Sequence, residues 1–138
     1  MRYLGLDLGS KTLGVSLSDK LGLIASFYKN ITYNDYETLI KELQEIIEKE
    51  GVEKLVLGYP KNMNNTLGER AEITLDFKKR LEDLGYSVAL EDERLTTKVA
   101  ESVLINADLS RKKRKKYIDG VSAVVILQSY LDKEHKNG

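Results

Sequence analysis

The stretch Tyr3-Leu4-Gly5-Leu6-Asp7-Leu8-Gly9 decides the fold, and a second run, Leu13-Gly14-Val15-Ser16-Leu17-Ser18-Asp19, follows it closely. Successive side chains of an extended strand point to opposite faces, so each run places large aliphatic residues on one face and small residues on the other. The polar link Ser10-Lys11-Thr12 between the runs predicts a β-hairpin. One face of this hairpin can therefore be buried in a core.

The small-residue face of the first run carries a single carboxylate, Asp7, between Gly5 and Gly9. A face without bulk around an acid leaves room for a ligand, such as a metal ion or a phosphate backbone. In the alternative interpretation the glycines only mark bulges in a two-sided strand. The hairpin alone favours neither interpretation.

Composition narrows the kinds of chemistry that are available. The chain has 138 residues, 41% hydrophobic and 32% charged, which predicts one soluble globular domain over residues 1–138. It has no cysteine and one histidine, His135, so thiolate, disulfide and histidine-rich metal chemistry are not expected. No apolar stretch approaches the roughly 20 residues of a membrane helix, and the N-terminus lacks a signal-peptide pattern. We therefore expect a cytoplasmic protein without a membrane partner.

Charge is balanced overall but unevenly distributed. The formal net charge is +0, and acidic residues gather in the segment 35–50. A continuous basic run stands later in the chain: Arg111, Lys112, Lys113, Arg114, Lys115 and Lys116. Such a run on a neutral protein can meet nucleic acid along one edge, or it can be a solvated loop before a helix.

The remaining periodicity predicts an α/β fold. We expect a strand over 24–33, a helix from 36 to about 50, a strand over 54–58, a loop over 59–67, a helix over 68–84, a strand over 87–91, a helix from about 96, and a last helix over 117–131 before a frayed tail from about 133. Asn34 or Asp35 can cap the first helix, and Gly51 can end it. Strands joined by helices must run parallel, so the sheet should be mixed, with helices on its faces.

Acidic residues fall at the ends of three predicted elements. Asp7 ends the first strand, Asp92 and Glu93 follow the last strand, and Asp119 lies in the first turn of the last helix. Small residues near Asp119 would let that helix approach the sheet and bring the acids together: Gly120, Ser122 and Ala123. Each acid also has a simpler explanation, since Asp119 could complement the helix dipole and the acids at 92 and 93 could pair with Arg94.

Converging carboxylates repel one another, and a cation between them would relieve that repulsion. Ligand sets made only of oxygen suit Mg²⁺ or Mn²⁺. Two such ions can activate water and stabilise the leaving oxygen in phosphodiester hydrolysis. This chemistry needs neither histidine nor cysteine.

The chain also resembles the YqgF/RuvX family of the RNase H-like superfamily, over essentially its whole length. The motifs that carry the resemblance are Gly5-Leu6-Asp7-Leu8-Gly9-Ser10-Lys11-Thr12-Leu13-Gly14-Val15, Gly58-Tyr59-Pro60-Lys61-Asn62-Met63, Asp92-Glu93-Arg94-Leu95-Thr96-Thr97 and Asp119-Gly120-Val121-Ser122-Ala123 with Ile126-Leu127-Gln128. The resemblance implies an RNase H-like fold with a five-stranded mixed sheet, in which three antiparallel strands precede parallel ones. It also implies a nuclease that processes the 5′ end of pre-16S ribosomal RNA.

Carried onto this sequence, the family's acidic triad falls on Asp7, Glu93 and Asp119, which would bind the divalent metal. Strand alternation favours Glu93 over Asp92, which stays open as an alternative. We expect nucleic-acid contacts from two sides of the cleft, namely from the basic run, Arg111, Lys112, Lys113, Arg114, Lys115 and Lys116, and from Lys61, Asn62 and Arg70. Further contacts are expected within the motifs, from Lys11, Arg94, Thr96 and Thr97.

Several functions remain open from the sequence. The first is a metal-dependent nuclease acting on structured RNA, including a pre-ribosomal particle, and the second is a resolvase that cuts four-way DNA junctions with the same residues. A resolvase cuts two strands symmetrically, which favours a homodimer over a monomer. A phosphotransferase of the actin and sugar-kinase kind would need two such domains, and a non-catalytic RNA-binding module would not need all three acids.

Overall fold

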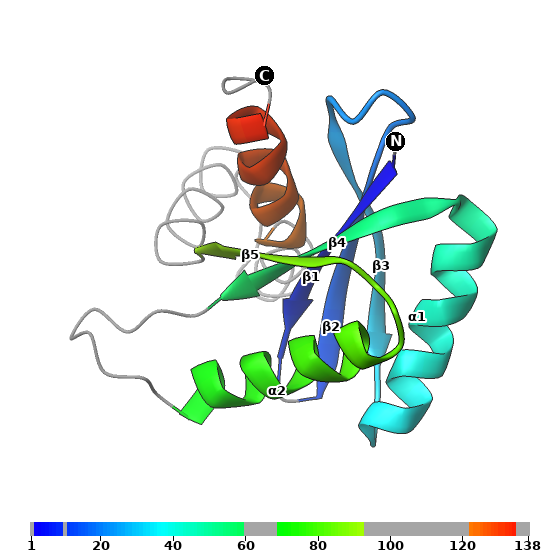
Figure 1. Ribbon diagram of the computed structural model, residues 1–138, viewed down its shortest axis with the longest axis vertical. Coiled ribbons are helices and arrows are strands. Elements are labelled where there is room, and N and C mark those ends of the chain that lie inside the picture. The colour runs from blue at the N-terminus through cyan, green and yellow to red at the C-terminus, as the bar shows by residue number, and fades with distance from the viewer. Residues whose placement is uncertain (1, 10, 60–68, 93–121, 135–138) are drawn as a thin grey trace, which may run out of the picture.

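The computed structural model describes residues 2–9, 11–59, 69–92 and 122–134 (Figure 1). A C-terminal helix covers residues 122–134. The other elements, in chain order, are β1 (Arg2–Leu8), β2 (Thr12–Ser18), β3 (Ala25–Thr32), α1 (Tyr36–Glu50), β4 (Val52–Tyr59), α2 (Glu69–Asp83) and β5 (Val88–Asp92).

The five strands form one mixed sheet in the order β3-β2-β1-β4-β5. The β1–β2 and β2–β3 pairs are antiparallel, whereas β1–β4 and β4–β5 are parallel. This confirms the predicted α/β class and the step from hairpin-connected to helix-connected strands. The carboxyl ends of the parallel strands β1, β4 and β5 meet at one edge of the sheet, and Asp7 lies next to the last residue of β1.

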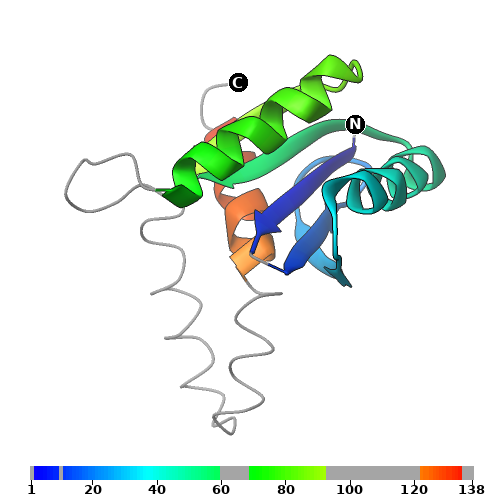
Figure 2. The same ribbon diagram turned by 90° about the horizontal axis from the view of Figure 1, so that it is seen from below.

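Helices cover both faces of the sheet, as Figure 2 shows, with α1 and α2 on one face and helix 122–134 on the other. The first face buries large side chains of the strands and helices, among them Leu4, Leu6, Leu39, Leu43, Leu55, Leu57, Phe77 and Leu81. The second face buries a smaller set: Ala25, Val56, Ile126, Leu127 and Leu131.

Helix α1 shows why its sequence begins and ends where it does. Of the two predicted caps, Asp35 takes the role, because its side chain accepts a 2.8 Å hydrogen bond from the amide of Thr38. That bond holds the pKa of the Asp35 carboxyl below its ordinary value. Gly51 ends the helix at φ 64°, a left-handed conformation in which a glycine has no Cβ penalty.

Element bounds differ from the predicted ones at several ends. Strand β4 extends beyond the predicted 54–58 at both ends, β5 runs one residue past the predicted 91, and helix 122–134 continues past the predicted 131. The predicted loop after β4, the helix from about 96 and the basic run lie outside the described residues. In the described part of the chain, no helix has the length and apolar character needed to cross a membrane.

Candidate active site

Asp7 projects from the sheet face that helix 122–134 covers. Its neighbours Leu6 and Leu8 are buried in the core beneath α1 and α2, so alternation directs Asp7 to the opposite face. Opposite it in β2 stands Gly14, which has no side chain to crowd it. The carboxylate is half-buried, and within the described residues no hydrogen bond or ion pair engages it. A carboxylate placed in this way can serve as an oxygen ligand for a cation.

Helix 122–134 lies unusually close to β1, and Gly5 is the reason. A β-carbon built on Gly5 would lie 2.3 Å from Ser16 Oγ, 2.7 Å from Leu127 Cβ and 2.9 Å from the Ala123 carbonyl oxygen. Ser16 Oγ also donates a 2.7 Å hydrogen bond to that carbonyl. The prediction that small residues at the start of this helix let it approach the sheet is therefore confirmed, since Ser122 and Ala123 are buried.

The room at Gly5 is thus not available to a ligand. In one of the two interpretations of the sequence, the small-residue face beside Asp7 leaves space for a metal ion or a phosphate backbone. At Gly5 this is wrong, because the helix itself occupies the space. At Gly9 the small residue belongs to a tight turn, in which the Gly9 amide donates a 2.8 Å hydrogen bond to the Thr12 carbonyl.

The direction of helix 122–134 determines which of its ends lies near Asp7. Ala123 lies over Gly5, whereas the ring of Tyr130 lies edge-on to that of Tyr3, with 6.0 Å between ring centroids. Since β1 runs from Tyr3 to Asp7, the helix runs antiparallel to it. The beginning of the helix is therefore its end closer to Asp7. Asp119, the predicted partner, precedes this point and lies outside the described residues.

Two further sets of contacts fix this helix across the width of the sheet. Gln128 accepts a 2.9 Å hydrogen bond from the amide of Ala25 at the start of β3, and donates one of the same length to the Leu23 carbonyl. On the far side, Ser129 and Lys133 both donate to the carboxylate of Glu91 in β5. The helix is thus attached to both outer strands.

Glu91 is a buried acid for which sequence analysis predicts no role. It is 5% exposed, faces helix 122–134 and forms an ion pair with Lys133. A carboxylate is rarely buried in this way without a charged partner. The available signal was an acid that directly follows three apolar residues in a short strand, and it points here to helix anchoring.

The second predicted acid lies at the end of this same strand. Asp92 is the last residue of β5, paired in register with Tyr59 at the end of β4. The expectation that Asp92 follows the strand is therefore wrong by one residue, because the β4–β5 ladder continues to it. Glu93, the preferred ligand, lies outside the described residues, so the choice between the two acids stays a prediction. Two strand spacings of about 4.8 Å separate β1 from β5.

The predicted metal site is thus described only at Asp7. Among the residues that the structure describes, no group of three or more histidine, cysteine, aspartate and glutamate side chains could hold a metal ion. Glu93 and Asp119, the other two predicted ligands, are outside that set. The donor chemistry of the three acids fits Mg²⁺ or Mn²⁺, which prefer oxygen ligands.

Of the predicted nucleic-acid contacts, Lys11 is the one whose side chain is described. It is exposed in the turn between β1 and β2, at the same end of β1 as Asp7. Arg70 belongs to α2, but its side chain is not among those described. The others lie outside the described residues: Lys61, Asn62, Arg94, Thr96, Thr97, Arg111, Lys112, Lys113, Arg114, Lys115 and Lys116.

Residues 1–133 match a family described as "RuvX: Holliday junction resolvase". The chain belongs to this family. A relative from Geobacillus sp. (strain WCH70) is 54% identical over 135 residues, covering 96% of this chain and 98% of the relative. A relative from Bacillus subtilis (strain 168) is 53% identical with the same coverage, and both carry the name "Putative pre-16S rRNA nuclease".

Solved structures show the same fold at low sequence identity. Thermus thermophilus RuvC in complex with a Holliday junction substrate matches with a TM-score of 0.67 and 13% identity, covering 99% of this chain and 96% of RuvC. The fowlpox virus Holliday junction resolvase matches with a TM-score of 0.57 and 11% identity, covering 97% of this chain and 99% of that protein. These similarities confirm the predicted RNase H-like fold of this RuvX chain.

Proposed function

We propose that this protein is a metal-dependent nuclease that hydrolyses phosphodiester bonds during 5′-end processing of pre-16S ribosomal RNA. The observation that carries the proposal is the placement of Asp7. It is a half-buried carboxylate at the carboxyl end of β1, on the face where helix 122–134 packs closely enough to exclude a methyl group at Gly5. Relatives of nearly the same length, about half identical, are named for this RNA, and the substrate implies a cytoplasmic location.

In this mechanism the acids share one task. Asp7, Glu93 and Asp119 would hold one or two Mg²⁺ or Mn²⁺ ions, which supply activation of water and stabilisation of the leaving oxygen. The contacts that the structure describes lie beside the proposed metal site and fix the position of helix 122–134 relative to β1. Gly5 and Ser16 fix how closely the helix lies on β1, and the beginning of the helix is its end closer to Asp7.

Substrate binding would rest on cations around that edge. Lys11 extends from the β1–β2 turn into solvent, where it can meet a phosphate. We assign the same role to the basic run 111–116 and to Lys61, Asn62 and Arg70, with Arg94, Thr96 and Thr97 beside the second acid. Phosphate contacts supply affinity without sequence information, so the shape of the RNA or its ribosomal context would define the substrate.

A second candidate is a resolvase of four-way DNA junctions. The family description and the fold shared with RuvC bound to a junction favour it. The catalytic acids would be the same, but symmetric cutting of two strands would require two copies of the chain acting together.

The deciding experiment offers purified protein two substrates of equal nucleotide number. One is an end-labelled 16S precursor fragment with an extended 5′ end, and the other is a four-way DNA junction. Each is incubated with Mg²⁺, with Mn²⁺ or with a chelator. We expect metal-dependent cleavage of the RNA at a defined position. Symmetric cutting of the junction, with the RNA left intact, would establish the resolvase instead.

The variant that tests the chemistry is Asp7→Asn, which keeps the shape of the side chain and removes its charge. We expect cleavage to fall by more than about 100-fold. Mutating a residue that only hydrogen-bonds to a metal ligand already costs about 10–100-fold in metal affinity or activity. Asp19→Asn is the matched control, since Asp19 is an acid in the opposite β2–β3 turn. Full activity of Asp7→Asn would reject the carboxylate mechanism. Tight RNA binding without cleavage in both proteins would indicate a non-catalytic binding module.

A further inference from the structure

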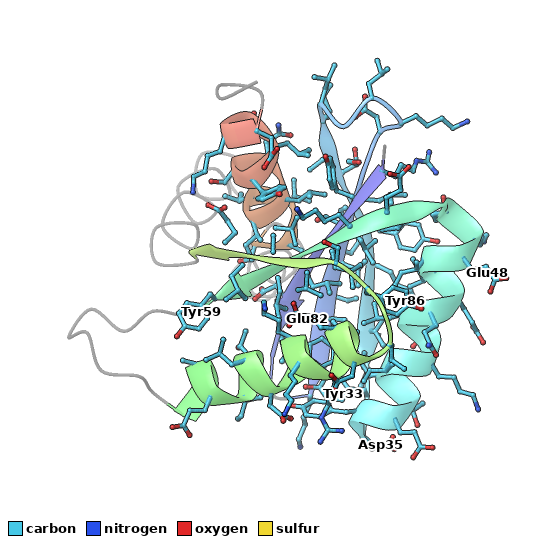
Figure 3. All side chains as sticks on the ribbon, in the orientation of Figure 1. Tyr33, Asp35, Glu48, Tyr59, Glu82 and Tyr86 are labelled. Atoms are coloured by element: carbon cyan, nitrogen blue, oxygen red, sulfur yellow. The ribbon has the colours of Figure 1, made fainter. Side chains whose placement is uncertain are left out.

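We propose that Tyr33 is a positioning residue that holds the β1–β2 turn in the shape that presents Lys11 to a nucleic-acid phosphate. Tyr33 lies between the end of β3 and the start of α1. Its side chain is one of those labelled in Figure 3, at the end of the sheet where β1 and β2 are joined. This inference rests on the proposed function, since it assumes that the turn meets substrate.

Tyr33 contacts the turn at two points. Its hydroxyl donates a hydrogen bond to the Gly9 carbonyl, and its backbone amide donates a 2.9 Å bond to the Lys11 carbonyl. The turn is further closed by the bond from the Gly9 amide to Thr12. One residue from a distant part of the chain therefore bonds to both Gly9 and Lys11.

The ring that carries this hydroxyl is itself firmly held. Tyr33 is 9% exposed, and its ring centroid lies 5.8 Å from that of Tyr36 in α1. Tyr36 in turn packs against Phe77 of α2 at 5.5 Å, and the Arg80 guanidinium lies 5.5 Å from the centroid of the Tyr36 ring. The hydroxyl is thus a fixed point, set by both helices of that face.

The Tyr33 hydroxyl should matter more for the position of Lys11 than for that of Asp7. Asp7 lies inside the β1–β2 ladder, where it pairs with Gly14. Lys11 lies beyond the end of that ladder with its side chain exposed. Loss of the Tyr33 hydroxyl should therefore disturb Lys11 and leave the carboxylate in place. This separates the expected effect on substrate binding from any effect on the chemical step.

The test is Tyr33→Phe, which removes the hydroxyl and keeps the ring. Binding is measured as the Kd for a fluorescently labelled 16S precursor fragment in the presence of a chelator, so that no cleavage occurs. We expect the Kd to rise about 3–10-fold, the range that loss of one hydrogen bond commonly produces. At saturating substrate with Mg²⁺, kcat should stay within about twofold of wild type. Tyr36→Phe, which leaves the Gly9 carbonyl its donor, should bind as wild type does.

A double-mutant cycle separates positioning from general packing. Lys11→Ala should weaken binding, and adding Tyr33→Phe to it should weaken binding no further, because Tyr33 acts through Lys11. If Lys11→Ala weakens binding but Tyr33→Phe does not, or if the two losses add, the inference is overturned and the proposed function stands. If Lys11→Ala binds as wild type does, the turn makes no phosphate contact, and the failure lies in the assignment of Lys11.

Discussion

The two faces of the sheet are packed in opposite ways. Beneath α1 and α2, large side chains such as Leu6, Leu57 and Phe77 are completely buried. Beneath helix 122–134, the contact with β1 and β2 is made at Gly5 and Ser16, where the helix lies almost on the backbone of the sheet. One face is filled by bulky side chains, and the other is defined by how little bulk it contains.

This difference implies a division of labour. Full burial of a large aliphatic or aromatic side chain contributes about 1.5–3 kcal/mol, so the first face supplies most of the stability. The second face buries fewer large side chains. Its contacts instead fix the position of helix 122–134, through the Ser16 hydrogen bond, the Gln128 contacts and the Glu91–Lys133 pair. Asp7 lies on the second face. We therefore expect substitutions on the first face to act on stability and those on the second to act on cleavage.

The largest effect on stability is expected from Phe77→Ala. Phe77 is fully buried between α2 and the sheet, and truncating a buried phenylalanine costs about 3–5 kcal/mol through lost burial and the cavity left behind. Urea unfolding followed by circular dichroism measures the loss. The comparison predicts that, at saturating substrate, the fraction still folded cleaves at the wild-type rate. Leu75→Ala on the same helix, at a side chain that is 40% exposed, should cost far less.

Gly5→Ala should have the opposite effect to Phe77→Ala, with a smaller loss of stability and a larger loss of cleavage. The added methyl group meets Leu127 Cβ at 2.7 Å and the Ala123 carbonyl at 2.9 Å, and neither is the far end of a flexible side chain. Overpacking of this kind costs about 1–3 kcal/mol, less than Phe77→Ala, but the helix must move away from β1. We expect cleavage to fall by more than about tenfold at temperatures where the variant is fully folded.

The double variant Gly5→Ala/Ser16→Ala is the control for that result. It removes the closest clash, at 2.3 Å to Ser16 Oγ, but keeps the other two and loses the Ser16 hydrogen bond to the Ala123 carbonyl, so rescue should be partial at most. Wild-type cleavage by folded Gly5→Ala would show that the spacing of this helix does not matter for activity. The proposed division between the faces would then be wrong.

The first face could be predicted from sequence because it obeys periodicity. The alternation of Leu4, Leu6 and Leu8, the caps at Asp35 and Gly51, and the order of elements gave the sheet, the helices and their faces. Periodicity reports which residues are buried, and this face is held by burial. The ends of strands were less predictable, because a ladder such as β4–β5 continues as long as its partner does.

The second face could be predicted only in part. The small residues Ser122 and Ala123 correctly indicate a close helix, but Gly5 allows two interpretations, room for a ligand or a bulge, and neither includes the helix that occupies the space. A glycine in sequence shows that bulk is absent and does not show what takes its place. The roles of Glu91 and Tyr33 could not be predicted from the sequence, because their partners, Lys133 and Gly9, are distant in the chain. The triad of Asp7, Glu93 and Asp119 stays a prediction.

The smallest effect is expected at Asp35, and its pH dependence sharpens the comparison, because Asp35 belongs to α1 and has no part in the second face. The bond from the Thr38 amide lowers the pKa of Asp35 in the folded protein below its ordinary value of 3.8. A group with a lowered folded pKa stabilises the fold above its unfolded pKa and loses that effect as pH falls through the folded value. Asp35→Ala should therefore be less stable than wild type at pH 7, and the difference should shrink as the pH falls below 3.8 and through the lowered pKa of the folded protein. Asp35→Asn, a neutral cap of similar strength, should lose none of its contribution over that range and so become more stable than wild type in acid.

Urea unfolding of the three proteins across this pH range measures both differences. A gap between wild type and Asp35→Ala that is the same at neutral and acid pH would mean that the charge of the cap does not stabilise α1.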